Sequence, residues 1–171
     1  CFSAYMVSVH FTGRVIHPGT ARGKLANAVT MAGEFLGMLP RSESPEATDG
    51  RYGFYCPIEV TGGMGQARVD LILRDFEMPE VERRLEAVRA FAAAVERAYP
   101  GSSVEVEYQE QYRNMRDIIA ETPEATQLLE EAIRQTGVEP AGNPIRGGTD
   151  GARLTQMGVP TPNIFAGPHN M

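Results

Sequence analysis

The chain has 171 residues, a formal net charge of −6 and a pI near 5.1. Proteins that bind the phosphate backbone of nucleic acids normally present a basic face, so this charge balance argues against a nucleic-acid partner. Hydrophobic residues make up 42% of the sequence, yet no apolar run approaches the roughly 18 residues of a membrane span, which argues against a membrane partner.

The two cysteines, Cys1 and Cys56, lack the spacing of a metal site and are too few for a disulfide framework. We therefore expect two free thiols and a reducing, cytoplasmic location. The chain begins at Cys1 rather than at a methionine, and its first residues already alternate as a strand does. We expect it to be a fragment of a longer protein.

The first 53 residues predict one strand, one helix and one long connection. Apolar Tyr5, Val7, Val9 and Phe11 alternate with other residues, which is typical of a strand with one covered face. Apolar residues at three- and four-residue steps between residues 25 and 39 predict an amphipathic helix that ends before a proline. Residues 41–53 are rich in Ser, Glu, Pro, Asp and Gly, and we expect an exposed connection with no chemistry of its own.

The next 60 residues predict a hairpin, a helix and a last strand. Two strands at residues 54–61 and 67–74 flank a glycine-rich loop and should pair antiparallel. The period of two places four side chains of the first of these strands together in the core: Phe54, Cys56, Ile58 and Val60. Apolar residues at helical spacing from Val81 to Tyr99 predict a helix that begins at Pro79 and is ended by Pro100 and Gly101. A last strand follows, with Val104, Val106 and Tyr108 facing inward.

The order strand, helix, strand, strand, helix, strand predicts an α+β, ferredoxin-like split βαβ domain. Such a domain has one four-stranded antiparallel sheet with two helices on one face, and we place it at residues 1–112. Residues 113–171 are too few to bury a convincing core, so we expect an incomplete α/β segment that packs on something larger. Within it we predict a helix ended by Gly137, a second helix after Thr149 and a short buried strand at residues 161–165.

His17 follows the first strand and precedes Pro18 and Gly19, so its ring should project from a rigid turn at the edge of the domain. An imidazole there could donate a hydrogen bond to a developing oxyanion. The alternative is a solvated turn histidine, which the local sequence by itself favours.

Arg146 stands directly before Gly147 and Gly148, with Thr149 and Asp150 at the start of a predicted helix. A guanidinium beside free backbone N–H groups suits a carboxylate or phosphate. The alternative is that Thr149 or Asp150 merely caps the helix while Arg146 pairs with a surface acid.

Two further positions near the predicted domain boundary leave alternatives open. Arg74 ends a strand and alternates with Asp70, so it is either a sheet-surface charge paired with that aspartate or part of a ligand clamp. Asn114 follows the last strand of the predicted ferredoxin-like domain, where a linker role outranks a catalytic one on the sequence alone.

Four stretches resemble the tripeptide aminopeptidase (peptidase T) branch of the M20 family of dinuclear-zinc metallopeptidases. They are Val15 to Gly23, Leu71 to Phe76, Tyr112 to Arg116 and Pro144 to Gly151. The resemblance covers essentially the whole chain. It implies a ferredoxin-like lid that mediates homodimerisation, followed by part of a catalytic domain.

The resemblance also implies roles for individual residues. His17 matches a lid histidine that reaches the partner subunit's active site and helps to polarise the scissile carbonyl. Arg74 and Arg146 match arginines that grip the terminal carboxylate of a short peptide substrate, in a pocket shaped by Gly147, Gly148 and Thr149, and Asn114 joins the substrate-binding set. Two Zn²⁺ ions per subunit are implied, with their ligands and the general base outside this chain, so we expect the fragment alone to be inactive.

Other functions remain open at this point. The chain could be a self-contained ferredoxin-like dimerisation or ligand-binding module without catalysis, or part of another M20 hydrolase acting on an amide or carbamoyl group. A nucleic-acid-binding version of the same topology is more distant, because the sheet offers no basic platform.

Overall fold

The computed structural model describes residues 1–164. Within this range, four strands and five helices follow one another, with two short 3₁₀ turns, Pro18–Thr20 and Arg41–Glu43, before the second strand. The elements are β1 (Ser3–Thr12), α1 (Ala28–Met38), β2 (Phe54–Gly62), β3 (Gln66–Asp75), α2 (Met78–Ala98), β4 (Ser103–Tyr112), α3 (Arg116–Glu121), α4 (Pro123–Gln135) and α5 (Asp150–Gln156).

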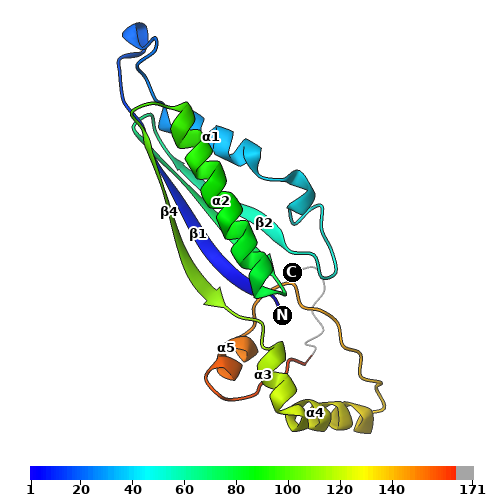
Figure 1. Cartoon of the computed structure of the whole chain (residues 1–171). Coiled ribbons are helices and arrows are strands. Elements are labelled where there is room, and N and C mark those ends of the chain that lie inside the picture. Colours follow the sequence, from blue (N-terminus) through cyan, green and yellow to red (C-terminus); the bar gives the residue numbers. More distant parts are fainter. Residues whose placement is uncertain (165–171) are drawn as a thin grey trace.

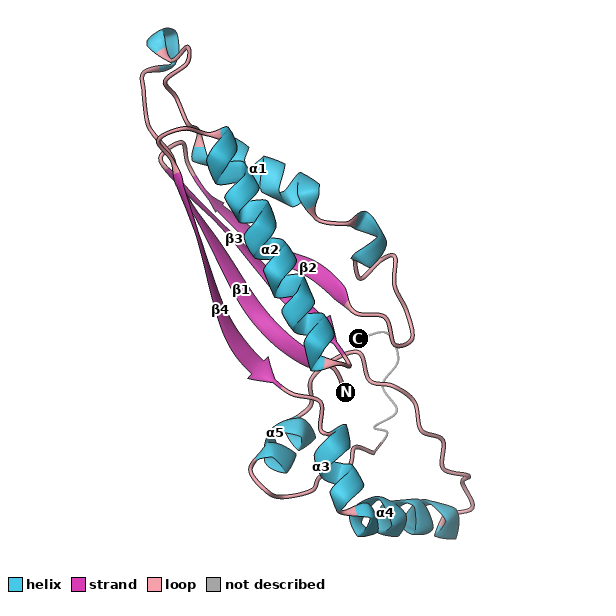
Figure 2. Cartoon of the chain, viewed as in Figure 1, coloured by secondary structure: helices cyan, strands magenta, loops and turns pink. Residues whose placement is uncertain are grey.

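The four strands form one antiparallel sheet in the order β2-β3-β1-β4, and α1 and α2 lie on the same face of it (Figures 1 and 2). The α+β, ferredoxin-like prediction is therefore confirmed. The core lies between this face and the two helices, because alternate residues of β1 and β3 pack against the inner sides of α1 and α2. Its fully buried members include Val7, Val9, Val69, Leu71, Met31, Phe35, Val88 and Val95.

The inward set predicted for β2 is correct in part. Phe54 is buried, but in a second cluster with Phe2 and Phe76, and Cys56 packs against that cluster. A β-bulge then interrupts the strand. The register with β3 shifts between Pro57 and Glu59, so residues before and after the shift follow opposite alternations. Tyr55, and not Cys56, enters the core under the helices. Ile58 and Val60 are half exposed at 50% and 52%, since β2 is an edge strand.

The helix boundaries follow local signals. The Asn27 side chain accepts a hydrogen bond from the Val29 amide at 3.0 Å and caps α1, which begins at Ala28, three residues after the first predicted apolar position. Pro79 occupies the first turn of α2 as predicted. The short helix α3 was not predicted, because it begins within the stretch that favours a linker.

The last third of the chain leaves the sheet at Tyr112 and continues through α3, α4 and α5 below it (Figure 1). The strand predicted at residues 161–165 is wrong for residues 161–164, which form no strand and expose Ile164 at 60%, and Phe165 lies outside the described residues. Both cysteines are free, as predicted, and burial raises the pKa of the Cys56 thiol. Among the described helices, none has the length and apolarity needed to span a membrane.

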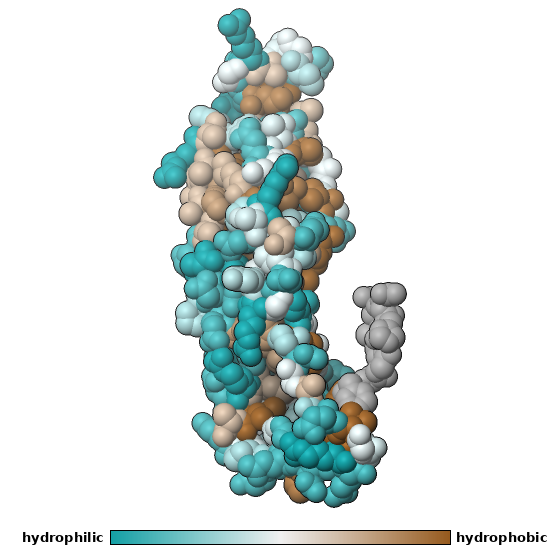
Figure 3. Space-filling view, turned by 90° about the vertical axis from the view of Figure 1, so that its right-hand side faces the viewer, coloured by the Kyte–Doolittle hydropathy of each residue, from teal (hydrophilic) through white to brown (hydrophobic). Residues whose placement is uncertain are grey.

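The side of the molecule that carries β2 and the 41–53 connection shows an uneven distribution of apolar surface (Figure 3). Hydrophobic side chains are frequent in the upper half of this face, while hydrophilic ones dominate much of the lower half. Large hydrophobic residues that α1 and β2 leave exposed include Val29, Ile58 and Val60.

Candidate functional site

Arg74 and Arg146 meet on a small aromatic cluster at the lower end of the sheet. Phe2, Phe54 and Phe76 form this phenylalanine cluster, with the Phe2 ring 5.7 Å from that of Phe54 and 4.5 Å from that of Phe76. The Arg74 guanidinium carbon lies 6.0 Å from the centre of the Phe54 ring, and that of Arg146 lies 5.4 Å from it. One aromatic ring thus holds both cations, at distances suited to cation–π attraction.

The strand register brings Arg74 to this place. Arg74 pairs with Phe54 across β2 and β3, so both side chains emerge on the sheet face that the helices leave open. Its Nη1 donates a hydrogen bond of 3.4 Å to the carbonyl oxygen of Arg146. The alternative pairing with Asp70 does not form, because Arg68 holds that aspartate with its Nε 2.9 Å from both carboxylate oxygens.

The glycines after Arg146 permit close packing against the sheet. A Cβ on Gly148 would lie 2.4 Å from the Tyr112 ring, so only glycine fits there. The Gly147 carbonyl accepts a hydrogen bond from the Phe2 amide at 3.3 Å. Thr149 caps α5 by accepting a hydrogen bond from the Ala152 amide at 3.2 Å. The helix-capping role that was the alternative reading of Thr149 is therefore confirmed.

Arg74 and Arg146 carry positive charges that no carboxylate compensates within the described residues. Arg68, Arg83, Arg84 and Arg116 each pair with a carboxylate, whereas within residues 1–164 no acidic side chain forms an ion pair with Arg74 or Arg146. The Nε of Arg74 and the hydroxyl of Tyr112 are buried and have no hydrogen-bond partner in the described structure. Buried polar atoms without partners are rare, and here they lie beside two uncompensated cations.

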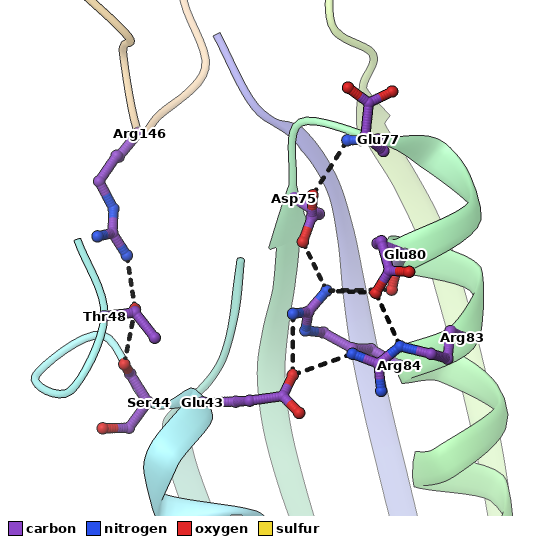
Figure 4. Close-up of polar contacts among 9 residues, drawn as sticks. All are labelled: Glu43, Ser44, Thr48, Asp75, Glu77, Glu80, Arg83, Arg84 and Arg146. Atoms are coloured by element: carbon purple, nitrogen blue, oxygen red, sulfur yellow. Dashed lines mark hydrogen bonds and ion pairs between the residues drawn. The ribbon is translucent and has the colours of Figure 1, made fainter. Parts of the chain in front are cut away.

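The 41–53 connection contributes to this site, contrary to the expectation that it has no chemistry of its own. Arg146 Nη2 donates a hydrogen bond of 2.7 Å to Thr48 Oγ1 (Figure 4). Earlier in the connection, Glu43 Oε2 lies 2.8 Å from Nη2 of the buried Arg84. The surface acid expected as an alternative partner of Arg146 is thus replaced by a threonine hydroxyl.

His17 lies at the opposite end of the sheet. It sits in the arm between β1 and α1, which projects beyond the top of the domain (Figure 1). The exposed His17 ring accepts a hydrogen bond from the Gly19 amide at Nδ1, at 3.1 Å. In the neutral tautomer this bond leaves Nε2–H free to donate outward. Since β1 has ten residues, its span of about 3.3 Å per residue puts roughly 30 Å between His17 and the arginines.

Asn114 lies at the junction below the sheet, near the arginines. Both the nitrogen and the oxygen of its side-chain amide already form hydrogen bonds within the chain. Its Nδ2 donates to the Phe76 carbonyl at 3.2 Å, and its Oδ1 accepts from the Arg116 amide at 3.0 Å. Arg116 also pairs with Glu77 at 2.6 Å, and this hydrogen-bonded guanidinium lowers the pKa of the Glu77 carboxyl. The structure therefore brings together Arg74, Arg146 and the glycines, with Asn114 nearby and His17 remote.

The described residues do not fit a metal centre. Across residues 1–164, no group of three or more histidine, cysteine, aspartate or glutamate side chains is arranged to hold a metal ion. The third histidine of the sequence, His169, lies outside the described residues.

Residues 2–103 match the family model described as the peptidase dimerisation domain of the M20 peptidases. The chain belongs to this family. The M20 dimerisation domain thus accounts for β1 to the start of β4, and the matched residues contain both His17 and Arg74 but not Arg146.

Peptidases T resemble the M20 chain along nearly its whole length. The peptidase T of Geobacillus thermodenitrificans is 40% identical over 169 residues, which are 99% of this chain and 41% of that protein. The peptidase T of Listeria welshimeri is 43% identical over 169 residues, again 99% of this chain and 41% of its own length. The chain therefore spans about two fifths of the length of these relatives.

Solved M20-type structures share the fold. A tripeptidase from Staphylococcus aureus matches with a TM-score of 0.73 at 13% identity, over 93% of this chain and 42% of its own. The aminopeptidase PepT from Bacillus cereus matches with a TM-score of 0.72 at 15% identity, with the same coverage. A Bacillus subtilis protein described as a dinuclear metal binding peptidase of the M20 family matches with a TM-score of 0.58 at 16% identity, over 93% of this chain and 39% of its own.

Proposed function

We propose that the chain is the lid and carboxylate-binding portion of a zinc-dependent aminopeptidase that releases the N-terminal residue from tripeptides. Residues 1–112 form the lid domain in this proposal, and residues 113–171 are part of the catalytic domain of a cytoplasmic enzyme. The observation that supports it best is the meeting of Arg74 and Arg146 on Phe54, without an ion pair to any acid in the described structure.

Two guanidinium groups from different parts of the chain suit the C-terminal carboxylate of a short peptide. Each can form charge-assisted, bidentate hydrogen bonds with a carboxylate, and the aromatic ring between them limits competition from water. The unpartnered Nε of Arg74 and hydroxyl of Tyr112 would gain partners when such a ligand is bound. In this proposal Gly147, Gly148 and Thr149 shape the carboxylate-binding site, where Gly148 packs against Tyr112. Asn114, which donates to the Phe76 carbonyl at 3.2 Å, belongs to the same substrate-binding set.

The proposal includes a homodimer in which His17 serves the partner's site. The description of the family as a dimerisation domain supports association. The separation of His17 from Arg74 and Arg146 supports a role in the other subunit, because a side chain roughly 30 Å away cannot act on a peptide held by these arginines. The exposed hydrophobic residues of α1 and β2, among them Val29 and Val60, favour this edge for the contact.

In this proposal the ligands of the two zinc ions come from polypeptide outside the described residues. The description of one solved M20 structure as a dinuclear metal binding peptidase supports two metal ions, and zinc is the metal that the family resemblance implies. Since residues 1–164 offer no cluster of metal ligands, the chain by itself should not hydrolyse peptides.

The test uses the complete enzyme and two substrates that differ only at the C-terminus, a free-acid tripeptide and its amide. Arg146→Gln and Arg74→Gln should each lower kcat/KM for the free acid by about 10- to 100-fold, as expected for loss of a charged hydrogen bond of about 1.5–3 kcal/mol. Activity on the amide should change little. Arg153→Gln is the matched control, because Arg153 is an exposed residue of α5. Equal losses on both substrates would contradict carboxylate binding.

A further inference from the structure

A series of contacts through the 41–53 connection links Arg146 to Arg74. Within the connection, Thr48 contacts Arg146 directly: Arg146 Nη2 donates to Thr48 Oγ1 at 2.7 Å, and Thr48 Oγ1 donates to the Ser44 carbonyl at 2.8 Å. A hydroxyl has one hydrogen to donate and lone pairs to accept. The bond to Ser44 uses that hydrogen, so the lone pairs of Thr48 face the cation.

The connection is itself anchored to the end of β3. Glu43, next to Ser44, binds Nη2 of Arg84 at 2.8 Å, and Nη1 of Arg84 binds Asp75 Oδ2 at 2.7 Å (Figure 4). The side chains of Arg84 and Asp75 are only 5% and 9% exposed, so this anchor is protected from water. Asp75 follows Arg74 directly in the chain.

The contacts therefore close a ring. It runs from Arg74 through its neighbour Asp75 to Arg84, Glu43, Ser44, Thr48 and Arg146, and Arg74 Nη1 completes it on the Arg146 carbonyl. A guanidinium on a flexible stem has many conformations, and binding a carboxylate with two hydrogen bonds selects only a few of them. Any contact that restricts the free arginine lowers this cost.

We propose that Thr48 is a positioning residue for substrate binding, which orients the Arg146 guanidinium toward the terminal carboxylate of the peptide. The inference rests on the proposed function of Arg146. It adds a role in substrate binding for the 41–53 connection, which contains no recognisable sequence motif. Thr48 does not touch the substrate in this account. It acts on affinity through Arg146, while the bond-breaking chemistry proceeds elsewhere.

The test measures the preference for a free-acid tripeptide over its amide, as a ratio of kcat/KM values, in the complete enzyme. Thr48→Val keeps the shape of the side chain and removes the hydroxyl, and it should lower the preference by about 5- to 20-fold, mainly through KM. Thr48→Ser retains the hydroxyl and should restore the preference to within about twofold. Thr48→Ala is a second variant in case the valine disturbs folding.

Thr136→Val is the matched control, because the Thr136 hydroxyl also donates to a preceding carbonyl, that of Ile133 at 2.7 Å, but accepts no hydrogen bond from an arginine side chain of residues 1–164. It should leave the preference unchanged. The double variant Thr48→Val with Arg146→Gln should resemble Arg146→Gln alone, since the threonine has nothing left to orient.

The outcomes separate the two proposals. If Arg146→Gln abolishes the preference while Thr48→Val and Thr48→Ala leave it intact, the positioning role is overturned and carboxylate binding stands. An effect of Thr48→Val that adds in full to that of Arg146→Gln would also overturn it. If Arg146→Gln itself leaves the preference unchanged, the proposed function fails, and the role of Thr48 fails with it.

Discussion

Gly148 and Tyr112 pack so closely that a Cβ on the glycine would lie 2.4 Å from the ring atoms Cε1 and Cζ. Tyr112 is the last residue of β4, and Gly148 lies two residues after Arg146. The contact therefore sets how near the segment that carries Arg146 can come to the sheet.

Gly148→Ala should push this segment away from Tyr112. We expect a loss of about 1–3 kcal/mol in the free energy of unfolding, as for other overpacked sites. Gly142→Ala is the control, because a Cβ there meets nothing within 4 Å, and it should change the free energy of unfolding by less than about 0.5 kcal/mol. Urea unfolding of the two variants measures the difference, and equal stabilities would contradict the packing argument.

Arg84 and Asp75 form a buried ion pair that should contribute far more than the surface pairs beside it. Arg84→Gln leaves Asp75 as an uncompensated buried charge, and we expect a loss of about 3–5 kcal/mol in stability. The neighbouring Arg83 also contacts Glu43 and Glu80, but its side chain is 49% exposed. Arg83→Gln should therefore cost less than about 1 kcal/mol. Denaturant unfolding of both variants at one ionic strength tests the contrast, and similar losses would show that burial does not decide it.

Asp70 should make stability depend on pH in the acid range. The bond from Arg68 lowers the pKa of the Asp70 carboxyl, with a further bond from Ser8 at 2.6 Å. A folded-state pKa below the unfolded value of about 3.9 gives stability that is present above the unfolded pKa. This stability is lost as the pH falls through the folded pKa.

Asp70→Asn should therefore be less stable than the wild type at pH 7, and the difference should shrink as the pH falls below about 4. Ser8→Ala removes one hydrogen bond and keeps the Arg68 pair, so it should show a smaller version of the same trend. Unfolding free energies measured between pH 3 and pH 7 test this. A difference that stays constant over that range would refute the assignment.

Mixed dimers can locate the action of His17. Dimers of His17→Ala subunits lack the histidine at both sites, and dimers of Arg146→Gln subunits lack the arginine. In a mixed dimer, one site combines Arg146 from the first subunit with His17 from the second and is intact. Equal mixing should restore about a quarter of the wild-type activity, since half the dimers are mixed and each has one intact site.

If His17 served its own subunit, the mixture would show only the residual activities of the two parents. A mixture of His17→Ala with wild type provides the reference for subunit exchange. The free energy of unfolding of the isolated chain should change little on His17→Ala, because the ring is exposed and bonds only to the nearby Gly19 amide.

Much of the fold could be predicted from the sequence because its signals are local. Alternation in β1, the three- and four-residue steps of α1 and the prolines at α2 each act within a few residues, and the order of the elements then restricts the topology. The error in β2 has the same origin. A period of two marks neither the extra residue of a bulge nor the edge of a sheet. It therefore does not show that Cys56 packs against the phenylalanine cluster, or that Val60 stays half exposed opposite Val69.

The site was only partly predictable, for a related reason. Arg146 and its glycines form a recognisable stretch, and so does the turn at His17, but Thr48 and Glu43 acquire their roles through contacts with residues 98 and 41 positions away. Nothing in a serine-, glutamate- and proline-rich connection distinguishes an anchored segment from a solvated one. The alternatives for Arg74 were likewise decided inside the sheet. Arg68, two residues before Asp70 on the same strand, binds that aspartate, and the register with β2 sets Arg74 beside Phe54.

The anchoring of the 41–53 connection also bears on which changes in length the protein can accept. Surface loops usually tolerate added residues, because closing a slightly longer loop costs little entropy. Here Glu43 and Thr48 are fixed to different partners only five positions apart. An insertion between them would force one partner to be abandoned, whereas the same insertion at exposed Gly50 leaves both in place. Homologous enzymes should therefore conserve the spacing of this stretch more strictly than its composition.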